Sequence, residues 1–198
     1  APDAGIIMIS SLTIEGANVT MEALQAGAFD FVTKPQVKAS EDGFAALREP
    51  LREAVAAFRE GRLQRARPAK LPLPARERAK VPVIDVVAIG VSTGGPSALA
   101  DLVPKLPPDL RVPVLIVQHM PARFTPSLAA SLDRRSKLRV LEAEEGRPLR
   151  AGEVLVAPGG KHLKISASNS EPFVRLSESA PVNSFRPSVD VLFESLAE

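Results

Sequence analysis

Short apolar runs that alternate with helix-like segments constrain the fold of this chain more than any other feature. The clearest runs are GIIMIS, VIDVVAIG and VPVLIVQH, at residues 5–10, 83–90 and 112–119. Segments with helical character are predicted after them, at residues 19–25, 96–102 and 125–132. Strands that alternate with helices favour an α/β fold with a mainly parallel, doubly wound sheet that helices cover on both faces.

Further short elements are predicted toward the end of the sequence. Four strands are expected, at residues 138–143, 153–158, 162–165 and 173–178. They include antiparallel pieces, since no helical segment separates the last of them. A final helix is predicted over Pro187–Leu196, with Pro187 at its first position, where the missing N–H of proline does no harm.

Composition changes sharply between two α/β stretches. The first stretch, residues 1–58, ends in a helix predicted from Phe44 to Phe58, which Pro50 is expected to kink or delay. Residues 59–80 then carry eight Arg or Lys, only two acidic residues and three prolines. This segment is predicted to be an exposed, semi-extended interdomain linker, and a docking segment for an acidic partner is the alternative. The second domain is expected over residues 81–198.

Composition also limits the classes of partner. With eight Phe, no Tyr, no Trp and a net charge of +2, the chain lacks the aromatic platforms and the positive charge that nucleic-acid binding needs. The absence of Cys excludes disulfides and thiolate chemistry and fits the cytosol. No apolar stretch approaches the ~18 residues of a membrane span, and no signal peptide is recognisable, so a cytoplasmic protein without membrane insertion is expected. The chain starts without Met, inside a predicted strand, and is expected to be part of a longer protein.

The strongest chemical signal is the turn Gly90-Val91-Ser92-Thr93-Gly94-Gly95-Pro96, between a strand and a helix. It matches the G-x-S-x-G pattern in the context that the pattern requires. Such a turn exposes the Ser92 hydroxyl at the carboxyl edge of the sheet, while Gly94 and Gly95 leave room for a substrate. The helix N-terminus then presents N–H groups to a developing negative charge. A phosphate-binding turn and a purely structural turn are the alternatives, although no phosphate-loop pattern fits.

The chain has two histidines, and each follows a predicted strand. His119 ends the strand after Ser92, and neighbouring parallel strands bring their carboxyl ends to one edge, so we predict Ser92 and His119 within hydrogen-bond reach. A strand-end histidine bound only to a loop is the alternative. His162 follows another strand; it could also face the site, but alone it fits a turn residue better.

A catalytic triad also needs a carboxylate that orients the imidazole. Asp101 and Asp109 lie in or after the intervening helix, which points them away from the strand ends. Asp190 falls in the first turn of the last helix, where the helix dipole stabilises a carboxylate. None of the three is expected to be the acid.

Five ordered motifs make the chain resemble the catalytic domain of the chemotaxis response-regulator methylesterases. They are Gly90–Pro96, Gln118–Pro121, Phe124–Thr125, Pro158–His162 and Val182–Asp190. Upstream, Met8–Thr13 and Gly27–Pro35 resemble the last third of a flavodoxin-like receiver domain. The resemblance implies that residues 1–58 are the C-terminal part of a receiver and that residues 81–198 are a methylesterase domain, incomplete at its C-terminal end.

The family hydrolyses glutamate γ-methyl esters on methyl-accepting chemoreceptors and often deamidates their glutamines. The resemblance implies Ser92 as nucleophile and His119 as general base, with Thr93 and His162 lining the site and Arg186 shaping the substrate cleft. Ser10, Phe31 and Lys34 match the receiver's switch hydroxyl, rotamer-changing aromatic and phosphate-contacting lysine.

Other family features lie outside this sequence. The catalytic Asp of the family lies beyond Glu198, and its phosphoacceptor and Mg²⁺-binding acids lie before Ala1. The resemblance implies no cofactor for catalysis, Mg²⁺ for the intact receiver only, and a histidine kinase as phosphodonor. An anion-binding output module and a general α/β-hydrolase acting on small esters are the alternative functions.

Overall fold

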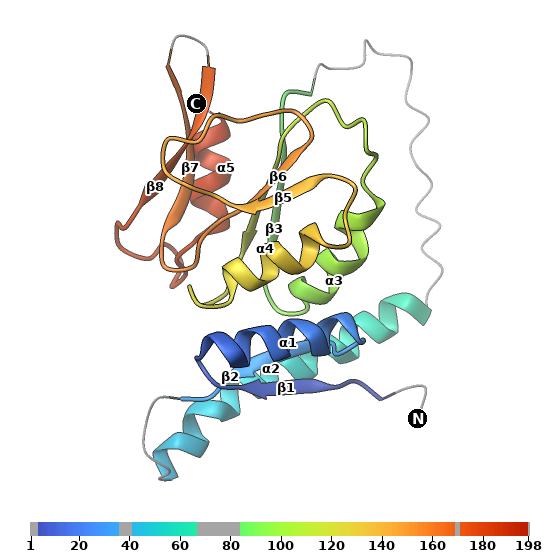
Figure 1. Ribbon diagram of the computed structural model, residues 1–198. Helices are drawn as coiled ribbons and strands as arrows, with labels where there is room; N and C mark the ends of the chain where they lie inside the picture. The colour runs from blue at the N-terminus through green and yellow to red at the C-terminus, as the bar shows by residue number, and fades with distance from the viewer. Residues whose placement is uncertain (1–3, 36–40, 67–83, 169–170, 198) are drawn as a thin grey trace.

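The computed structural model describes residues 4–35, 41–66, 84–168 and 171–197. Its first four elements form an N-terminal unit: β1 (Ile7–Ser10), α1 (Ile14–Gln25), β2 (Asp30–Thr33) and α2 (Glu41–Ala66). The elements from β3 onward form a second unit, which we call the sheet unit. Figure 1 shows the N-terminal unit below the sheet unit, with α1 facing α3 and α4.

The N-terminal unit contains the strand predicted at residues 5–10, which is β1 and pairs in parallel with β2, with Ile7 opposite Asp30. Helix α1 begins at Ile14, five residues before the predicted start. The Thr13 side chain caps it by accepting a hydrogen bond from the Gly16 N–H, at 2.9 Å. The prediction missed this cap because it relied on the run of helix formers after Val19.

Helix α2 is longer than the sequence pattern predicted. It continues through Pro50 to Ala66, whereas the prediction ended it at Phe58. The semi-extended conformation predicted from Arg59 is therefore wrong for residues 59–66. These residues are mostly Arg, Leu, Gln, Glu and Ala, which favour a helix despite their charge. The rest of the predicted linker, residues 67–80, lies outside the described residues.

The sheet unit is built on four parallel strands in the order β3-β4-β6-β5. The strands are β3 (Val87–Val91), β4 (Val114–Gln118), β5 (Arg139–Glu142) and β6 (Glu153–Val156). The predicted mainly parallel α/β sheet is confirmed. All five residues of β4 are buried, so this strand forms the centre of the core.

Helices and a hairpin cover the two faces of this sheet. On one face, α3 (Gly95–Leu102), the short 3₁₀ turn η1 (Val103–Lys105) and α4 (Thr125–Asp133) pack against Val114 and Ile116. On the other face, α5 (Val189–Ala197) and the antiparallel pair β7 (His162–Ser168) and β8 (Glu171–Ser177) pack against Leu115 and Val117. Alternate β4 residues thus serve opposite faces, as a strand buried on both sides requires.

The last helix begins later than predicted. Pro187 was expected at its first position, but α5 starts at Val189. The N–H of Ser188 donates to the imidazole of His162 at 3.2 Å, which holds this residue in the loop before the helix. Within the described residues, no helix is both long and apolar enough to cross a membrane.

Candidate active site

The turn after β3 places Ser92 at the carboxyl edge of the sheet. Gly94 has φ of +74°, in the left-handed region that glycine tolerates best, and it precedes the first residue of α3. The Gly95 N–H closes the turn by donating to the Ser92 carbonyl at 2.8 Å. Ser92 and Thr93 are exposed in this turn. The sequence pattern therefore produces the strand-turn-helix arrangement that it predicted.

The glycines of the turn make room for neighbouring side chains of this chain. A Cβ on Gly95 would lie 2.0 Å from Gln118 Oε1, and one on Gly94 would lie 3.0 Å from the ring of Phe29. Gln118 is 2 % exposed, and its Nε2 donates to the carbonyls of Ser92 and His119 at 3.0 and 3.1 Å. Gln118 therefore joins the turn to the end of β4.

His119 follows β4 directly and meets Ser92 across the sheet edge. Val91 lies opposite Gln118 in the parallel register, and the His119 N–H donates to the Val91 carbonyl at 3.1 Å. The Nδ1 atom of His119 lies 3.2 Å from Ser92 Oγ. The predicted contact between the two side chains is confirmed. A hydroxyl within reach of an imidazole nitrogen is the arrangement that activates a serine nucleophile.

The imidazole of His119 is partly enclosed. Its ring stacks on Phe185, with centroids 3.8 Å apart and planes 7° apart. Its Nε2 atom is buried and has no hydrogen-bond partner among the described residues. Burial lowers the pKa of His119 below 6.5, while the negative charge of Asp190 acts in the opposite direction. The lowered pKa favours the neutral form, which is the form that accepts a proton.

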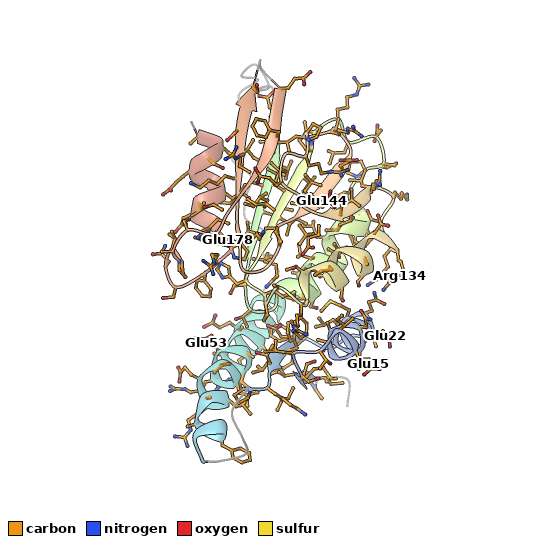
Figure 2. All side chains as sticks on the ribbon, turned by 60° about the vertical axis from the view of Figure 1, so that its left-hand side comes forward. Glu15, Glu22, Glu53, Arg134, Glu144 and Glu178 are labelled. Carbon is orange, nitrogen blue, oxygen red and sulfur yellow. The ribbon has the colours of Figure 1, made fainter. Side chains whose placement is uncertain are left out.

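Ser92 and His119 share a cavity of about 210 Å³ with residues of the N-terminal unit. Phe31 from β2 and Glu53 from α2 line its walls, and Figure 2 labels Glu53 on α2. The N-terminal unit therefore forms part of the wall of the site.

One carboxylate of the N-terminal unit reaches the Ser92 turn itself. Asp30 Oδ2 accepts a hydrogen bond from the Gly94 N–H at 2.6 Å, and Oδ1 accepts one from the Phe31 N–H at 2.8 Å. Asp30 is 6 % exposed, and burial raises its pKa, although these two hydrogen bonds oppose the rise. No sequence pattern predicts this contact, because Asp30 and Gly94 lie far apart in the chain.

The structure does not bring His162 to the cavity. Its side chain is fully buried; Nδ1 accepts from the Ser188 N–H, and Nε2 lies 3.1 Å from the Ala180 carbonyl oxygen. Arg186 also faces its own loop, because its guanidinium donates to the carbonyls of Glu178 and Ser179 at 2.8 and 3.0 Å. The resemblance matched both positions to the site but carried no information on where the side chains point.

The three residues matched to a receiver lie at or beside the ends of β1 and β2. Ser10 is buried and accepts a hydrogen bond from the Thr20 hydroxyl at 2.7 Å. Phe31 stacks on Phe124 with ring centroids 4.7 Å apart. Lys34 is exposed, and its N–H donates to the Ser10 carbonyl at 2.7 Å.

The three aspartates that are not expected to be the catalytic acid lie in or near helices. Asp101 is in α3, Asp109 follows η1, and Asp190 is in the first turn of α5, where it accepts a hydrogen bond from Asn183. None of them lines the cavity. Among the described residues, no cluster of three His, Asp or Glu side chains has a geometry that could hold a metal ion.

Known proteins match most of this chain. The family model described as CheB methylesterase matches residues 87–198, which is more than half of the sequence. The chain belongs to the CheB methylesterase family. A crystal structure of the Thermotoga maritima CheB methylesterase catalytic domain superposes with a TM-score of 0.56 and 43% sequence identity, covering 59% of this chain and 61% of that one.

Curated CheB relatives extend the similarity to the N-terminal unit. A protein-glutamate methylesterase/protein-glutamine glutaminase of Desulfotalea psychrophila is 41% identical and covers 100% of this chain. One with the same name from Geobacillus kaustophilus is 43% identical and covers 97%. The chain spans 59% and 56% of the length of these two relatives.

Proposed function

We propose that this chain carries the nucleophile and the general base of a protein-glutamate methylesterase and glutaminase. The substrates would be glutamate γ-methyl esters, and glutamine amides, on chemoreceptors in bacterial chemotaxis. The contact of 3.2 Å between Ser92 Oγ and His119 Nδ1 carries the proposal, together with membership of the CheB family. The names of the relatives supply the substrate class.

The proposed reaction proceeds through an acyl-enzyme. Ser92 Oγ attacks the ester carbonyl carbon while His119 takes the hydroxyl proton, and the same proton then leaves with methanol as the C–O bond breaks. Water repeats these steps on the acyl-enzyme, which releases the glutamate carboxylate. The backbone N–H of Thr93, and that of Gly94 once Asp30 no longer accepts from it, would stabilise the oxyanion, because the Gly95 N–H already donates to the Ser92 carbonyl. The chemistry needs no metal or organic cofactor.

We propose that the third catalytic residue is an Asp outside residues 1–198. His119 Nε2 is buried without a partner among the described residues, so a carboxylate there would gain a hydrogen bond and would orient the ring. Asp190 is the described carboxylate whose charge acts on His119, but its Oδ2 is engaged by Asn183.

Replacing Asp190 tests this assignment. We expect Asp190→Asn to reduce kcat by less than about 10-fold, whereas loss of a triad Asp costs ~10⁴-fold in a serine protease. Methanol release from a methylated chemoreceptor would measure it, with Glu194→Gln in the same helix as the control. A loss of 10³-fold or more specific to Asp190→Asn would make Asp190 the acid.

The N-terminal unit, which includes α2 to Ala66, is proposed to be the C-terminal part of a receiver domain, with residues 81–198 as a second domain. Phosphorylation of the intact receiver by the chemotaxis histidine kinase, with Mg²⁺, would then regulate the esterase. Contacts at the site support this regulation. Phe31, Glu53 and Asp30 line the cavity, and Asp30 accepts the hydrogen bond of the Gly94 N–H. Movement of the N-terminal unit would free that N–H for the oxyanion.

A comparison of substrates tests the proposed function. Full-length protein that contains this chain should release methanol from a methylated chemoreceptor and should be labelled at Ser92 by a fluorophosphonate probe. An anion-binding module would show neither result. A general α/β-hydrolase would turn over small esters as fast as the receptor, and that outcome would reject the proposed substrate class.

A further inference from the structure

The loop between β8 and α5 carries an aromatic ring onto His119. We call residues 178–188 the clamp loop. Phe185 stacks face to face on the His119 imidazole, with centroids 3.8 Å apart and planes 7° apart, and it also lines the cavity. The side of the imidazole covered by this ring is closed to water, and tilting the imidazole toward it would produce a clash. The position of the clamp loop therefore restricts the orientation of the imidazole.

Contacts within the clamp loop hold Phe185 at its tip. Val182 and Phe185 exchange backbone hydrogen bonds of 3.1 and 3.0 Å across a tight turn, in which Asn183 and Ser184 have φ of +51° and +68°. Arg186 donates to the carbonyls of Glu178 and Ser179, which ties the end of the loop back to its beginning. Figure 2 labels Glu178, which also forms a salt bridge of 3.2 Å with Lys161.

The buried imidazole of His162 anchors this loop to the sheet unit. Its Nδ1 accepts from the Ser188 N–H, so the ring proton lies on Nε2, which donates to the Ala180 carbonyl. One neutral side chain thus binds both arms of the loop, on either side of Phe185. The Gly160 N–H adds a hydrogen bond of 3.1 Å to the Arg186 carbonyl. The His162 side chain has no exposed surface.

We propose that Phe185 is a positioning residue for His119, and that His162 is the buried anchor that keeps Phe185 against the imidazole. This inference rests on the proposed role of His119 as general base. It gives His162 a role in the reaction without contact with the substrate. The clamp loop would hold the His119 ring plane so that one nitrogen faces Ser92 Oγ.

The same contact contributes to the desolvation of His119. Burial is the main cause of its lowered pKa, and Phe185 supplies an apolar face against the ring. The charged groups that face this region are Asp190 from α5, Asp30 from β2 and Glu53 from α2. Asp190 is the group whose charge acts on His119, and it raises the pKa, while none of the three carries a positive charge; the lowered pKa therefore reflects enclosure of the ring rather than a nearby positive charge.

An NMR titration of the imidazoles tests the positioning role without measuring turnover. The chain has two histidines, so both can be followed in the whole chain. We expect Phe185→Ala to raise the pKa of His119 toward its ordinary value, because water regains access to the ring. Phe193→Ala is the matched control, since Phe193 on α5 is 45 % exposed and Phe185 is 43 % exposed. An unchanged pKa of His119 in Phe185→Ala overturns the proposal.

The anchor role is tested by the same measurement. We expect His162→Ala to raise the pKa of His119 in the same direction, and Phe185→Ala to add nothing further in that background. Should His162→Ala fail to fold, Arg186→Ala is the substitute, because it removes the hydrogen bonds to the Glu178 and Ser179 carbonyls. It is expected to raise the pKa of His119 as well. If Phe185→Ala shifts the pKa of His119 but neither anchor variant does, the anchor role is rejected.

In the full-length enzyme, kcat should fall by up to about 10²-fold in Phe185→Ala, with KM little changed. Because the titration needs no catalysis, a failure of the proposed function leaves its result readable.

Discussion

Ser92→Ala is expected to abolish fluorophosphonate labelling and to lower kcat for receptor methyl-ester hydrolysis by about 10⁴-fold or more. The Ser92 hydroxyl is exposed at the cavity, and its Oγ contacts His119 Nδ1 at 3.2 Å. Removing the oxygen removes the acyl-enzyme route altogether, and only binding and oxyanion stabilisation remain. Quantified methanol release by the full-length enzyme would measure the loss.

Ser97→Ala provides the control for this result. Ser97 is the third residue of α3, so the substitution changes a serine near the site without altering the proposed nucleophile. We expect Ser97→Ala to keep labelling and turnover. Nucleophilic catalysis by Ser92 would be disproved if a folded Ser92→Ala variant kept more than about a tenth of the wild-type rate.

The sequence was sufficient to predict the Ser92–His119 contact because both positions follow from the geometry of a parallel sheet. The strands before Ser92 and His119 are strongly apolar, which predicts neighbouring strands of one sheet, although β4 is fully buried and β3 only partly so. Parallel strands place their carboxyl ends at one edge, so two polar residues that follow such strands meet there. The G-x-S-x-G pattern added the sharp turn that exposes the hydroxyl.

The remaining site residues depend on tertiary contacts that no local pattern encodes. Asp30 lies 64 positions before Gly94 in the sequence, and its role depends on how the N-terminal unit packs on the turn. Phe185 reaches His119 only because His162 and Arg186 fix the clamp loop. Gln118 is the exception, because a polar residue in an otherwise apolar buried strand is visible in the sequence. Such a residue needs hydrogen-bond partners, and in the structure these are the carbonyls of Ser92 and His119.

Gly95→Ala is expected to have the second-largest effect on stability and turnover. The added methyl group would collide with Gln118, which packs against the Ser92 turn. A Cβ at this position would lie 2.0 Å from Gln118 Oε1 and 2.9 Å from Val91 Cβ, and Gln118 is almost fully buried. Overpacking of this kind costs about 1–3 kcal/mol of unfolding free energy. Relief requires Gln118 to move, which releases the Ser92 carbonyl and shifts the nucleophile; a displacement of about 1 Å can lower kcat by ~10²-fold.

Two further variants separate this steric conflict from other effects of replacing glycine. Gly61→Ala in α2 is the matched control, since a Cβ there meets nothing within 4 Å, and it should stabilise the helix by about 0.5–1 kcal/mol. Gln118→Ala removes the atom that a Gly95 methyl group would strike. Urea unfolding should then show that Gly95→Ala costs less in the Gln118→Ala background than in the wild type, while the contact to Val91 remains. Equal costs in the two backgrounds would show that Gln118 is not what requires glycine at this position, and the loss would have to come from the backbone of the turn.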